Sequence, residues 1–310
     1  MATAAFKYFS LSKDQTDRNR TESRRALSWR KSKRQMMKKE GQNKKMSNND
    51  LWIRDAITSY GLLLFVFVIV VILISRKWSD LKKCIYKAYL TGFEVECAEL
   101  MIPYKKFLFK SLQHVVSGDK VLRSMGCIRL LEIGIKTGEN IQFYPDSTRL
   151  IGVDRNRRLP EYLTKGNRSW QFSHIIIERL IVGDGSCLRE VPTGYVDAVV
   201  TTRSLCSVTS LQSTLREIHR VLAPGGQYIF IEHIPENEGT LLRWLQKILS
   251  QTKIWPSFFG GCRLDIDPVV NIKSAGFNHI TWDIFTLDGY VSHPFYLILS
   301  RQHVLGMAIR

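Results

Sequence analysis

The residues of this chain that could bind a ligand stand at the ends of short apolar segments. One segment ends in the glycine turn LEIGIKTG, residues 131–138, where missing side chains let the backbone approach a ligand closely. The next ends at Asp154, twenty residues past Gly134, where a carboxylate can accept hydrogen bonds from both hydroxyls of a ribose. A third ends in Gly183-Asp184, placed to meet an adenine amino group. These residues predict a site for an adenosine-containing cofactor.

Both carboxylates also have structural explanations. Asp154 could cap a following helix, but its place at the end of a buried strand favours ligand binding. The sequence Gly183-Asp184-Gly185 is a good turn as well as a good binding loop, so for Asp184 the two interpretations stay open.

His233 and Cys206 are the candidates for acid–base or thiol chemistry at the site. His233 ends a later apolar segment and is the candidate catalytic base; a structural histidine that caps the next loop is the alternative. Cys206 is either part of a substrate-pocket wall or a reactive thiol. None of the 6 cysteines stand two residues apart, so the sequence predicts neither a metal site nor a disulfide scaffold, and it favours a reducing, cytosol-facing compartment.

Alternating strands and helices must position these residues. One helix is expected over residues 211–222, where apolar residues recur at helical spacing until Pro224-Gly225-Gly226 stops them. The strand candidates are residues 128–134, 149–154, 175–184, 197–202 and 227–233. This alternation predicts a doubly wound, parallel α/β sheet within residues 126–310.

A separate hydrophobic segment precedes this domain. Residues 56–75 form a run of twenty residues without a charge, about 30 Å long as a helix, which matches the hydrocarbon core of a bilayer. A buried core helix is the alternative, which the unbroken apolar run disfavours. We therefore predict a membrane anchor helix over residues 51–77. Residues 78–125 read as an amphipathic helical cap that lies on the membrane surface, on the sheet, or on both.

Most of the net charge of +17 belongs to the N-terminal tail, because residues 1–50 carry a net +9 and residues 111–310 only +4. The tail is rich in polar residues and is predicted to be disordered. It is a solvated leader, a patch for anionic lipid, or a nuclear signal around Arg30 to Arg34. The nearly balanced domain argues against nucleic acid as a partner.

These motifs together resemble the class I S-adenosylmethionine-dependent methyltransferases, and more narrowly the methyltransferase-like 7 family of membrane-associated thiol S-methyltransferases. The matching stretches are LLEIGIKTGENIQFYP (130–145), VDAVVTTRSLCSV (196–208), REIHRVLAPGGQYIFIEH (216–233) and HVLGMAIR (303–310). The resemblance implies a Rossmann-like sheet of seven strands, the last antiparallel, preceded by a membrane helix. It also implies S-adenosyl-L-methionine as the cofactor.

The resemblance carries roles over to matching positions. Glu132, Gly134 and Gly138 would belong to the loop that holds the methionine end of the cofactor. Asp154 would bind the ribose, and Asp184 would lie near the adenine.

Two positions depart from the family pattern. Lys136 replaces a glycine, so it either crowds the methionine moiety and repels the sulfonium, points to solvent, or pairs with the cofactor carboxylate. Arg155 replaces a proline and is expected to alter only the loop beyond the ribose.

The sequence therefore predicts a membrane-anchored methyltransferase that transfers a methyl group to a small lipophilic thiol. The implied location is the endoplasmic reticulum or lipid droplets, with the catalytic domain facing the cytosol. The positive charges that flank the helix favour a cytosolic N-terminus, which for a spanning helix would place the catalytic domain in the lumen. A monotopic helix with both flanks in the cytosol reconciles this orientation with a cytosolic catalytic domain, while a spanning anchor stays open. A catalytically weakened membrane or lipid-droplet protein, and O- or C-methylation of a lipid or quinone, are the alternatives.

Overall fold

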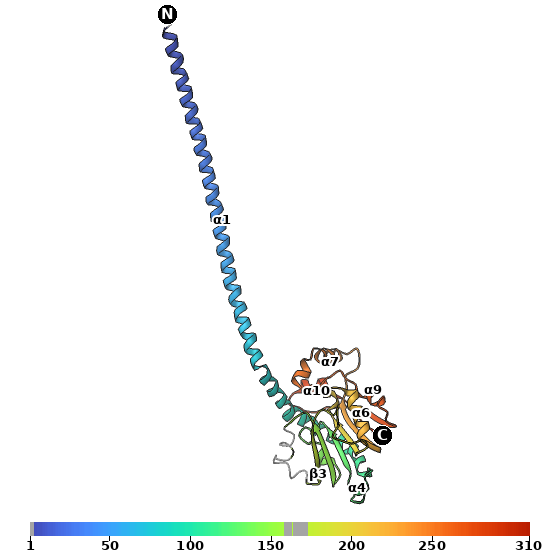
Figure 1. Cartoon of the computed structure of the whole chain (residues 1–310). Helices are drawn as coiled ribbons and strands as arrows, with labels where there is room; N and C mark the ends of the chain where they lie inside the picture. Colours follow the sequence, from blue (N-terminus) through green and yellow to red (C-terminus); the bar gives the residue numbers. More distant parts are fainter. Residues whose placement is uncertain (1–2, 158–162, 164–172) are drawn as a thin grey trace. The chain divides into compact units, whose positions relative to one another are not determined.

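The computed structural model describes residues 3–157, 163 and 173–310, and the chain divides into two units, Met1–Trp78 and Ser79–Arg310 (Figure 1). The first unit is entirely helical where it is described, and the second contains the sheet. Helix α1, Thr3–Ala88, begins in the first unit and ends in the second.

Helix α1 is longer than the sequence led us to expect. The tail of residues 1–50 was predicted to lack a fixed structure, whereas the structure has residues 3–50 as helix. The chain has no proline before Pro103, and α1 contains only two glycines, so its sequence contains few helix breakers. The side chains of residues 20–41 are all exposed, so this stretch buries no core.

One described helix is long and apolar enough to cross a membrane, judged by length and composition. It lies within residues 51–100, its most apolar window has a mean hydropathy of 2.9, and none of that window is buried. This segment contains the predicted anchor, residues 51–77. Soluble proteins usually bury such runs in a core, whereas this window is exposed in the part of the chain that the structure describes.

The predicted cap, residues 78–125, is largely helical. After the end of α1 it contains, in order, the π-helix η1 (Tyr89–Phe93), α2 (Glu94–Leu100), α3 (Ile102–Phe109), the 3-10 helix η2 (Lys110–His114) and α4 (Lys120–Ser124). Helix α4 begins at a capping aspartate, Asp119, whose carboxylate accepts hydrogen bonds from two backbone N–H groups.

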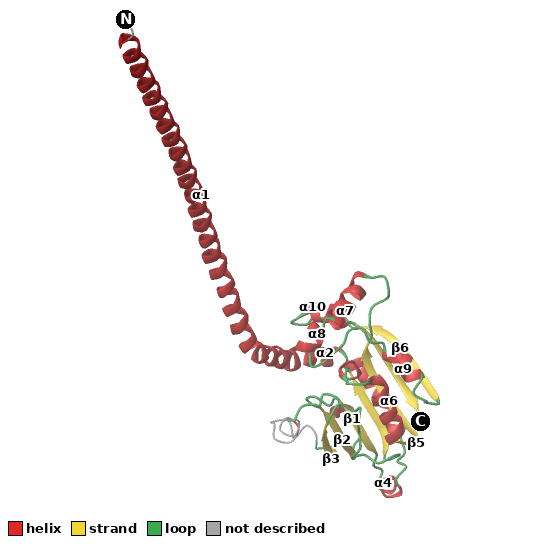
Figure 2. Ribbon diagram, turned by 45° about the horizontal axis from the view of Figure 1, so that its top comes forward, coloured by secondary structure: helices red, strands yellow, loops and turns green. Residues whose placement is uncertain are grey.

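The sheet has seven strands in the order β3-β2-β1-β4-β5-β7-β6 (Figure 2). The first five are parallel, and β7 is antiparallel to both of its neighbours. Their bounds are β1 Arg129–Ile133, β2 Thr148–Asp154, β3 Ile175–Val182, β4 Val196–Thr202, β5 Leu222–His233, β6 His279–Thr286 and β7 Gln302–Ile309. This confirms the predicted Rossmann-like class. Because β1 lies between β2 and β4, the strand order reverses there, and ligands bind outside the carboxyl ends at such a point.

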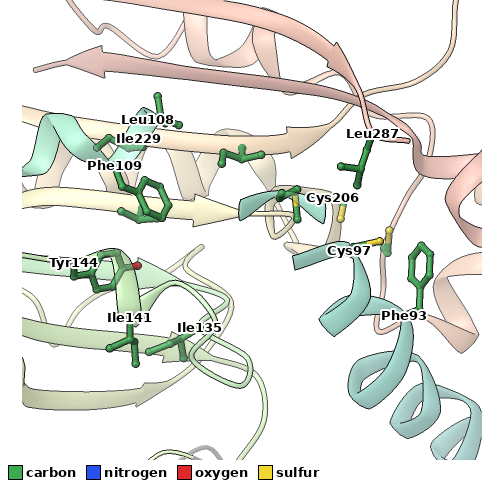
Figure 3. Close-up of a cluster of buried hydrophobic side chains, with 14 of the residues drawn as sticks. Phe93, Cys97, Leu108, Phe109, Ile135, Ile141, Tyr144, Cys206, Ile229 and Leu287 are labelled. Carbon is green, nitrogen blue, oxygen red and sulfur yellow. The ribbon is translucent and has the colours of Figure 1, made fainter. Parts of the chain in front are cut away.

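Alternate residues of the central strands serve two cores. On one face Leu131, Val199 and Tyr228 pack with helix α6 (Leu211–Val221) and α9 (Pro268–Lys273). The opposite face packs against the cap in a second cluster that includes Phe93, Cys97 and Ile229, part of which Figure 3 draws. This period of two is the pattern of a sheet covered on both sides. Helices α7 (Leu241–Gln251), α8 (Ile254–Phe258) and α10 (Pro294–Ser300) complete the described elements beside the sheet.

Candidate active site

The glycine turn after β1 packs tightly against the loop after β4. Gly134 has a φ of 75°, and a Cβ added there would lie 2.7 Å from the Cβ of Ser204, so both conformation and space require glycine. Lys136, two residues later, has a φ of 50°, in the left-handed region that a lysine rarely adopts. The loop therefore keeps the conformation of a glycine-rich turn although one of its glycines is missing.

Asp154 joins this turn to the end of β2. Its Oδ2 accepts a hydrogen bond from the backbone N–H of Lys136 at 2.9 Å, and its Oδ1 accepts one from Asn156 N at 2.8 Å. Each carboxylate oxygen can accept more than one hydrogen bond, so capacity remains for a ligand. Asp154 also lines a cavity of about 460 Å³, the first cavity, together with Gly134, Asp184 and Tyr86.

Asp184 ties the loop after β3 to the loop after β4. Its Oδ1 accepts from Ser186 N at 3.0 Å, and its Oδ2 accepts from Thr209 N at 2.8 Å. Burial alone would raise the pKa of Asp184, but the hydrogen bonds from Ser186 and Thr209 outweigh it and hold that pKa well below its usual range. The turn proposed for Gly183-Asp184-Gly185 is thus present, and the same carboxylate borders the first cavity.

The side chain of Arg155 crosses the first cavity. Its guanidinium donates to Asp184 Oδ2 at 3.2 Å, to Thr209 Oγ1 at 3.0 Å and to the carbonyl of Gly260 at 3.3 Å. The sequence led us to expect that Arg155 alters only the loop beyond the ribose. The structure differs, because a long side chain from that loop reaches the neighbouring strand end, where the family's proline could not.

Glu132 lies at the base of the glycine turn and is 1% exposed. Its two carboxylate oxygens accept hydrogen bonds from Asn140 Nδ2 at 2.6 Å and Tyr144 OH at 2.7 Å. Burial raises the pKa of Glu132 to about 7, although both hydrogen bonds oppose the shift. This contact explains the FYP sequence: its tyrosine fixes the buried acid of the turn.

A second cavity of about 400 Å³ holds two buried polar groups without partners among the described residues. Lys105, from α3, is 1% exposed, and the influences on its pKa are burial and through-space charge. Burial lowers the pKa of Lys105 to about 8. The Oδ1 atom of Asn140 accepts no hydrogen bond. A buried lysine and a buried acceptor that line one cavity are suited to a ligand that carries both a carboxylate and an ammonium group.

A buried acid from the cap neutralises Lys136. Glu94, the first residue of α2, accepts a hydrogen bond from Lys136 Nζ at 2.5 Å through Oε2. Its Oε1 accepts from Arg203 Nε at 3.2 Å and Arg203 Nη2 at 3.0 Å. The sequence left three alternatives for Lys136: to crowd the methionine moiety, to point to solvent, or to pair with the cofactor carboxylate. The structure shows a different one, because the ammonium of Lys136 pairs with the protein carboxylate of Glu94.

A third cavity of about 300 Å³ contains the two candidates for acceptor chemistry. Cys206 and His233 both line it, with Cys262 and the aromatic rings of Tyr89 and Phe259. The Sγ atom of Cys262 lies 3.3 Å from His233 Nε2. A hydrogen bond with Cys262 and burial together raise the pKa of Cys206, whereas that hydrogen bond, aided by nearby Arg203, lowers the pKa of Cys262.

The three cavities meet at two residues. Lys136 and Arg203 line all of them, so a ligand that filled the first and second would present its middle to the third. The structure thus gathers Gly134, Asp154 and Asp184 around the first cavity, and Glu132 around the second. Gly138 has a φ of 80° and closes the turn through a hydrogen bond to Ile135, without lining any of these cavities.

Sequence reasoning missed four residues of this site: Glu94, Lys105, Arg203 and Cys262. Arg203 stands inside the quoted stretch 196–208, so a charged residue directly after a buried strand was a usable signal. Glu94 and Lys105 come from the cap, and no local pattern separates them from the other charges there.

Known proteins with similar sequences have one activity in common. A family model described as a methyltransferase domain matches residues 131–230. The human thiol S-methyltransferase TMT1A is 32% identical over 236 residues, which cover 75% of this chain and 89% of that protein. The human thiol S-methyltransferase TMT1B is 30% identical over 233 residues, with the same two coverages.

Solved structures also resemble this chain. The geranyl diphosphate C-methyltransferase of Streptomyces coelicolor, in complex with S-adenosyl-L-homocysteine, matches with a TM-score of 0.47 and 17% identity, over 67% of this chain and 75% of that one. The arsenic(III) S-adenosylmethionine methyltransferase of Chlamydomonas reinhardtii matches with a TM-score of 0.42 and 16% identity, over 59% and 62%. With the human relatives and the domain match, the sheet and its cofactor loop lead to one conclusion: the chain is an S-adenosylmethionine-dependent methyltransferase of class I and belongs to the methyltransferase-like 7 family of thiol S-methyltransferases.

Proposed function

We propose that this enzyme methylates the sulfur of a small lipophilic thiol while held at a membrane by residues 51–77. The observation that carries the proposal is the meeting of three cavities at Lys136 and Arg203. One suits a nucleoside, one suits an amino acid, and one is lined by aromatic rings and thiols. S-adenosylmethionine joins the first two groups through its sulfonium.

The unpartnered groups of the second cavity fit the methionine end of the cofactor. Lys105 would bind the α-carboxylate, and Asn140 Oδ1 would accept from the α-ammonium. Glu132 would hold Asn140 in place through their 2.6 Å hydrogen bond. Asp154 would accept from the ribose hydroxyls, and Asp184 would hold the loops around the adenine. When bound, the cofactor supplies an electrophilic methyl group.

The third cavity would hold the acceptor close to that methyl group. Methyl transfer requires a nucleophile held in line in a site that excludes water. Part of its lining is aromatic and buried, with Phe259 7% exposed and Tyr89 7% exposed, so a lipophilic thiol would be desolvated against these rings. His233 is placed to accept the thiol proton, since its Nδ1 has no partner in the described part of the chain.

The test is methylation by the purified full-length chain. With S-adenosylmethionine, a small alkyl thiol should give the methyl thioether, while the matching alcohol and a quinol should not react. Methylation of the oxygen or carbon acceptor instead would overturn the choice of thiol. Substrates that partition into lipid should react best if the anchor serves to reach them.

Replacing Asp154 by alanine should weaken cofactor binding by about 2–4 kcal/mol, roughly 30- to 1000-fold, because two ribose hydroxyls lose a charged acceptor. Calorimetric titration of the variant measures this, and its thermal unfolding shows whether the turn after β1 survives without the 2.9 Å hydrogen bond from Lys136. Equal affinity in a folded variant would place the ribose elsewhere.

Replacing Lys136 by glycine should strengthen cofactor binding and weaken the fold. Glycine adopts a φ of 50° without strain, and a side chain leaves the point where the cavities meet. Against this, Glu94 loses one of its two cationic partners and keeps Arg203. Titration with S-adenosylmethionine decides the first effect and denaturant unfolding the second. Weaker binding by the glycine variant would show that Lys136 contacts the cofactor, and no binding by either form would favour a catalytically weakened relative.

The membrane part of the proposal rests on the exposed apolar helix within residues 51–100. We propose that it anchors the protein to the endoplasmic reticulum or lipid droplets with the catalytic domain on the cytosolic side. Protease added to intact microsomes should digest the domain, and alkaline carbonate should leave the protein in the membrane fraction. Full protection would reverse the orientation, and release by carbonate would remove the anchor.

A further inference from the structure

Three side chains that could bind a metal converge in the third cavity. Cys206 lies in the 3-10 helix η5 (Leu205–Ser207) after β4, His233 is the last residue of β5, and Cys262 follows α8. Their ligand atoms all lie within 4.8 Å of one another, and all three residues are buried. Since 26 and 28 residues separate them in the sequence, no zinc-motif spacing could reveal them.

The geometry of this cluster is close to that of a metal site. The 3.3 Å between Cys262 Sγ and His233 Nε2 is near the separation of about 3.5 Å that two ligands of a tetrahedral zinc ion show, with Zn–S near 2.3 Å and Zn–N near 2.0 Å. The loops are fixed to one another, because the backbone N–H of Arg263 donates to the carbonyl of Cys206 at 3.0 Å. The ligands are therefore held together by the backbone.

No oxygen of the described residues competes for the imidazole. The side-chain partners of the His233 ring are the thiols of Cys262 and Cys206, and Nδ1 has no hydrogen-bond partner in the described part of the chain. A histidine committed to structure normally donates to a carbonyl or carboxylate. His233 therefore has a nitrogen lone pair available for a metal.

We propose that Cys206, His233 and Cys262 bind one zinc ion, which leaves a fourth coordination position open to the third cavity. Two thiolates and an imidazole are a ligand set that zinc prefers, and three protein ligands with an open position are typical of catalytic rather than structural zinc. All three residues line the cavity, so the open position faces the acceptor space.

This site would activate the acceptor, and in that respect the inference rests on the proposed function. In place of the proton transfer to His233 described above, the sulfur of a thiol R–SH would coordinate the fourth position and release its proton to solvent, because a metal-bound thiol is deprotonated. A lone pair of that sulfur then forms the new S–CH₃ bond as the sulfonium C–S bond breaks. The products are R–S–CH₃ and S-adenosylhomocysteine, so charge and atoms balance without a further reactant.

The experiment measures metal binding by the full-length chain in detergent micelles. The protein purified under reducing conditions should contain about one zinc ion per chain. Exchange with Co²⁺ should give thiolate-to-cobalt charge-transfer absorption and the visible bands of a tetrahedral site. A small alkyl thiol should shift those bands, since it enters the open position.

Substitutions separate these ligands from other cysteines. Cys262→Ser and His233→Asn should each weaken zinc binding by more than the roughly 10- to 100-fold that loss of an outer partner costs. Cys127→Ser is the matched control, because Cys127 is also buried but lies outside the cluster; it should keep the metal and the cobalt spectrum. Calorimetry with S-adenosylmethionine shows whether each variant is folded.

Two results would overturn the inference without touching the proposed function. One is a chain that binds S-adenosylmethionine and methylates thiols with its cysteines reduced and no bound zinc or cobalt. The other is a Cys206–Cys262 disulfide in the native protein, detected by mass spectrometry as the loss of two hydrogens. A chain that binds zinc but transfers no methyl group to any thiol would instead refute the proposed function and leave the metal site standing.

Discussion

Replacing Lys105 by methionine should weaken S-adenosylmethionine binding by roughly 150- to 5000-fold, because breaking a buried ion pair costs about 3–5 kcal/mol. Lys105 is 1% exposed and has no hydrogen bond or ion pair within the described residues, so the unliganded protein already bears the cost of its burial. The variant should therefore be at least as stable as the parent. Calorimetric titration measures the affinity for S-adenosylmethionine, and denaturant unfolding measures the stability.

The pH dependence of binding supplies an independent check on Lys105. Its pKa is lowered to about 8, so the ammonium that would meet the cofactor carboxylate is lost as the pH rises through that value. Affinity should fall above about pH 8, and Lys105→Arg, which stays charged, should move the fall upward. Any titration of the cofactor itself is common to both proteins. Because the unfolded chain holds this proton more tightly, stability should rise with pH between about 8 and the ordinary value of 10.5.

The controls for Lys105 are on the same helix. Lys106→Met removes a neighbouring charge that does not line the second cavity and should leave affinity within a factor of about 3. If Lys105→Met and Lys106→Met bound the cofactor equally well, the methionine end would lie outside the second cavity.

Replacing Glu94 by alanine should destabilise the catalytic domain by about 3–5 kcal/mol, which is the cost of leaving buried charges unpaired. Glu94 is 7% exposed, and Arg203, which it pairs with, is 4% exposed. Glu99 is an exposed acid of the same helix, so Glu99→Ala should change stability by less than about 0.5 kcal/mol. Urea unfolding monitored by circular dichroism compares the two variants.

A double substitution tests whether the network is the cause. In the double variant Glu94→Ala/Lys136→Met, the second substitution removes one of the two cations that Glu94→Ala leaves unpaired. The double variant should therefore lose less stability than the sum of the losses in the two single variants. Strict additivity would mean that Glu94 stabilises the cap through packing and not through charge.

The central parallel strands β1, β2 and β4 could be predicted from the sequence because they are buried on both sides. For β1, β2 and β4 the expected bounds differ from the observed ones by at most two residues. The start of β5 was misplaced, since Pro224-Gly225-Gly226 reads as a break, whereas the chain is already extended from Leu222. The edge strand β6 was not located at all. Most of its side chains are exposed, so it has no apolar run to mark it.

The residues of the candidate site likewise fall into those that could be predicted from the sequence and those that could not. Gly134, Asp154 and Asp184 follow strand ends, and the topology alone places them around one cavity. Lys105 and Glu94 reach the site from helices that precede the sheet, so their positions depend on how the cap packs. The sequence pattern predicts that a segment is helical, but not which element the helix packs against. For the same reason the convergence of Cys206 with Cys262 depends on two loops that only the folded backbone brings together.

The position of β7 in the sheet has a consequence for the order in which the protein folds. This strand, Gln302–Ile309, follows β6 in the chain, yet it lies between β5 and β6 and pairs with both along its length. Until it emerges, β5 has an open edge and β6 has no partner in the sheet. The sheet can therefore be completed only after β7 has been synthesised, when the apolar segment within residues 51–100 has already been made. In the membrane-anchored enzyme proposed above, insertion of that segment would come first and completion of the sheet second, so the chain would bind its cofactor at the membrane.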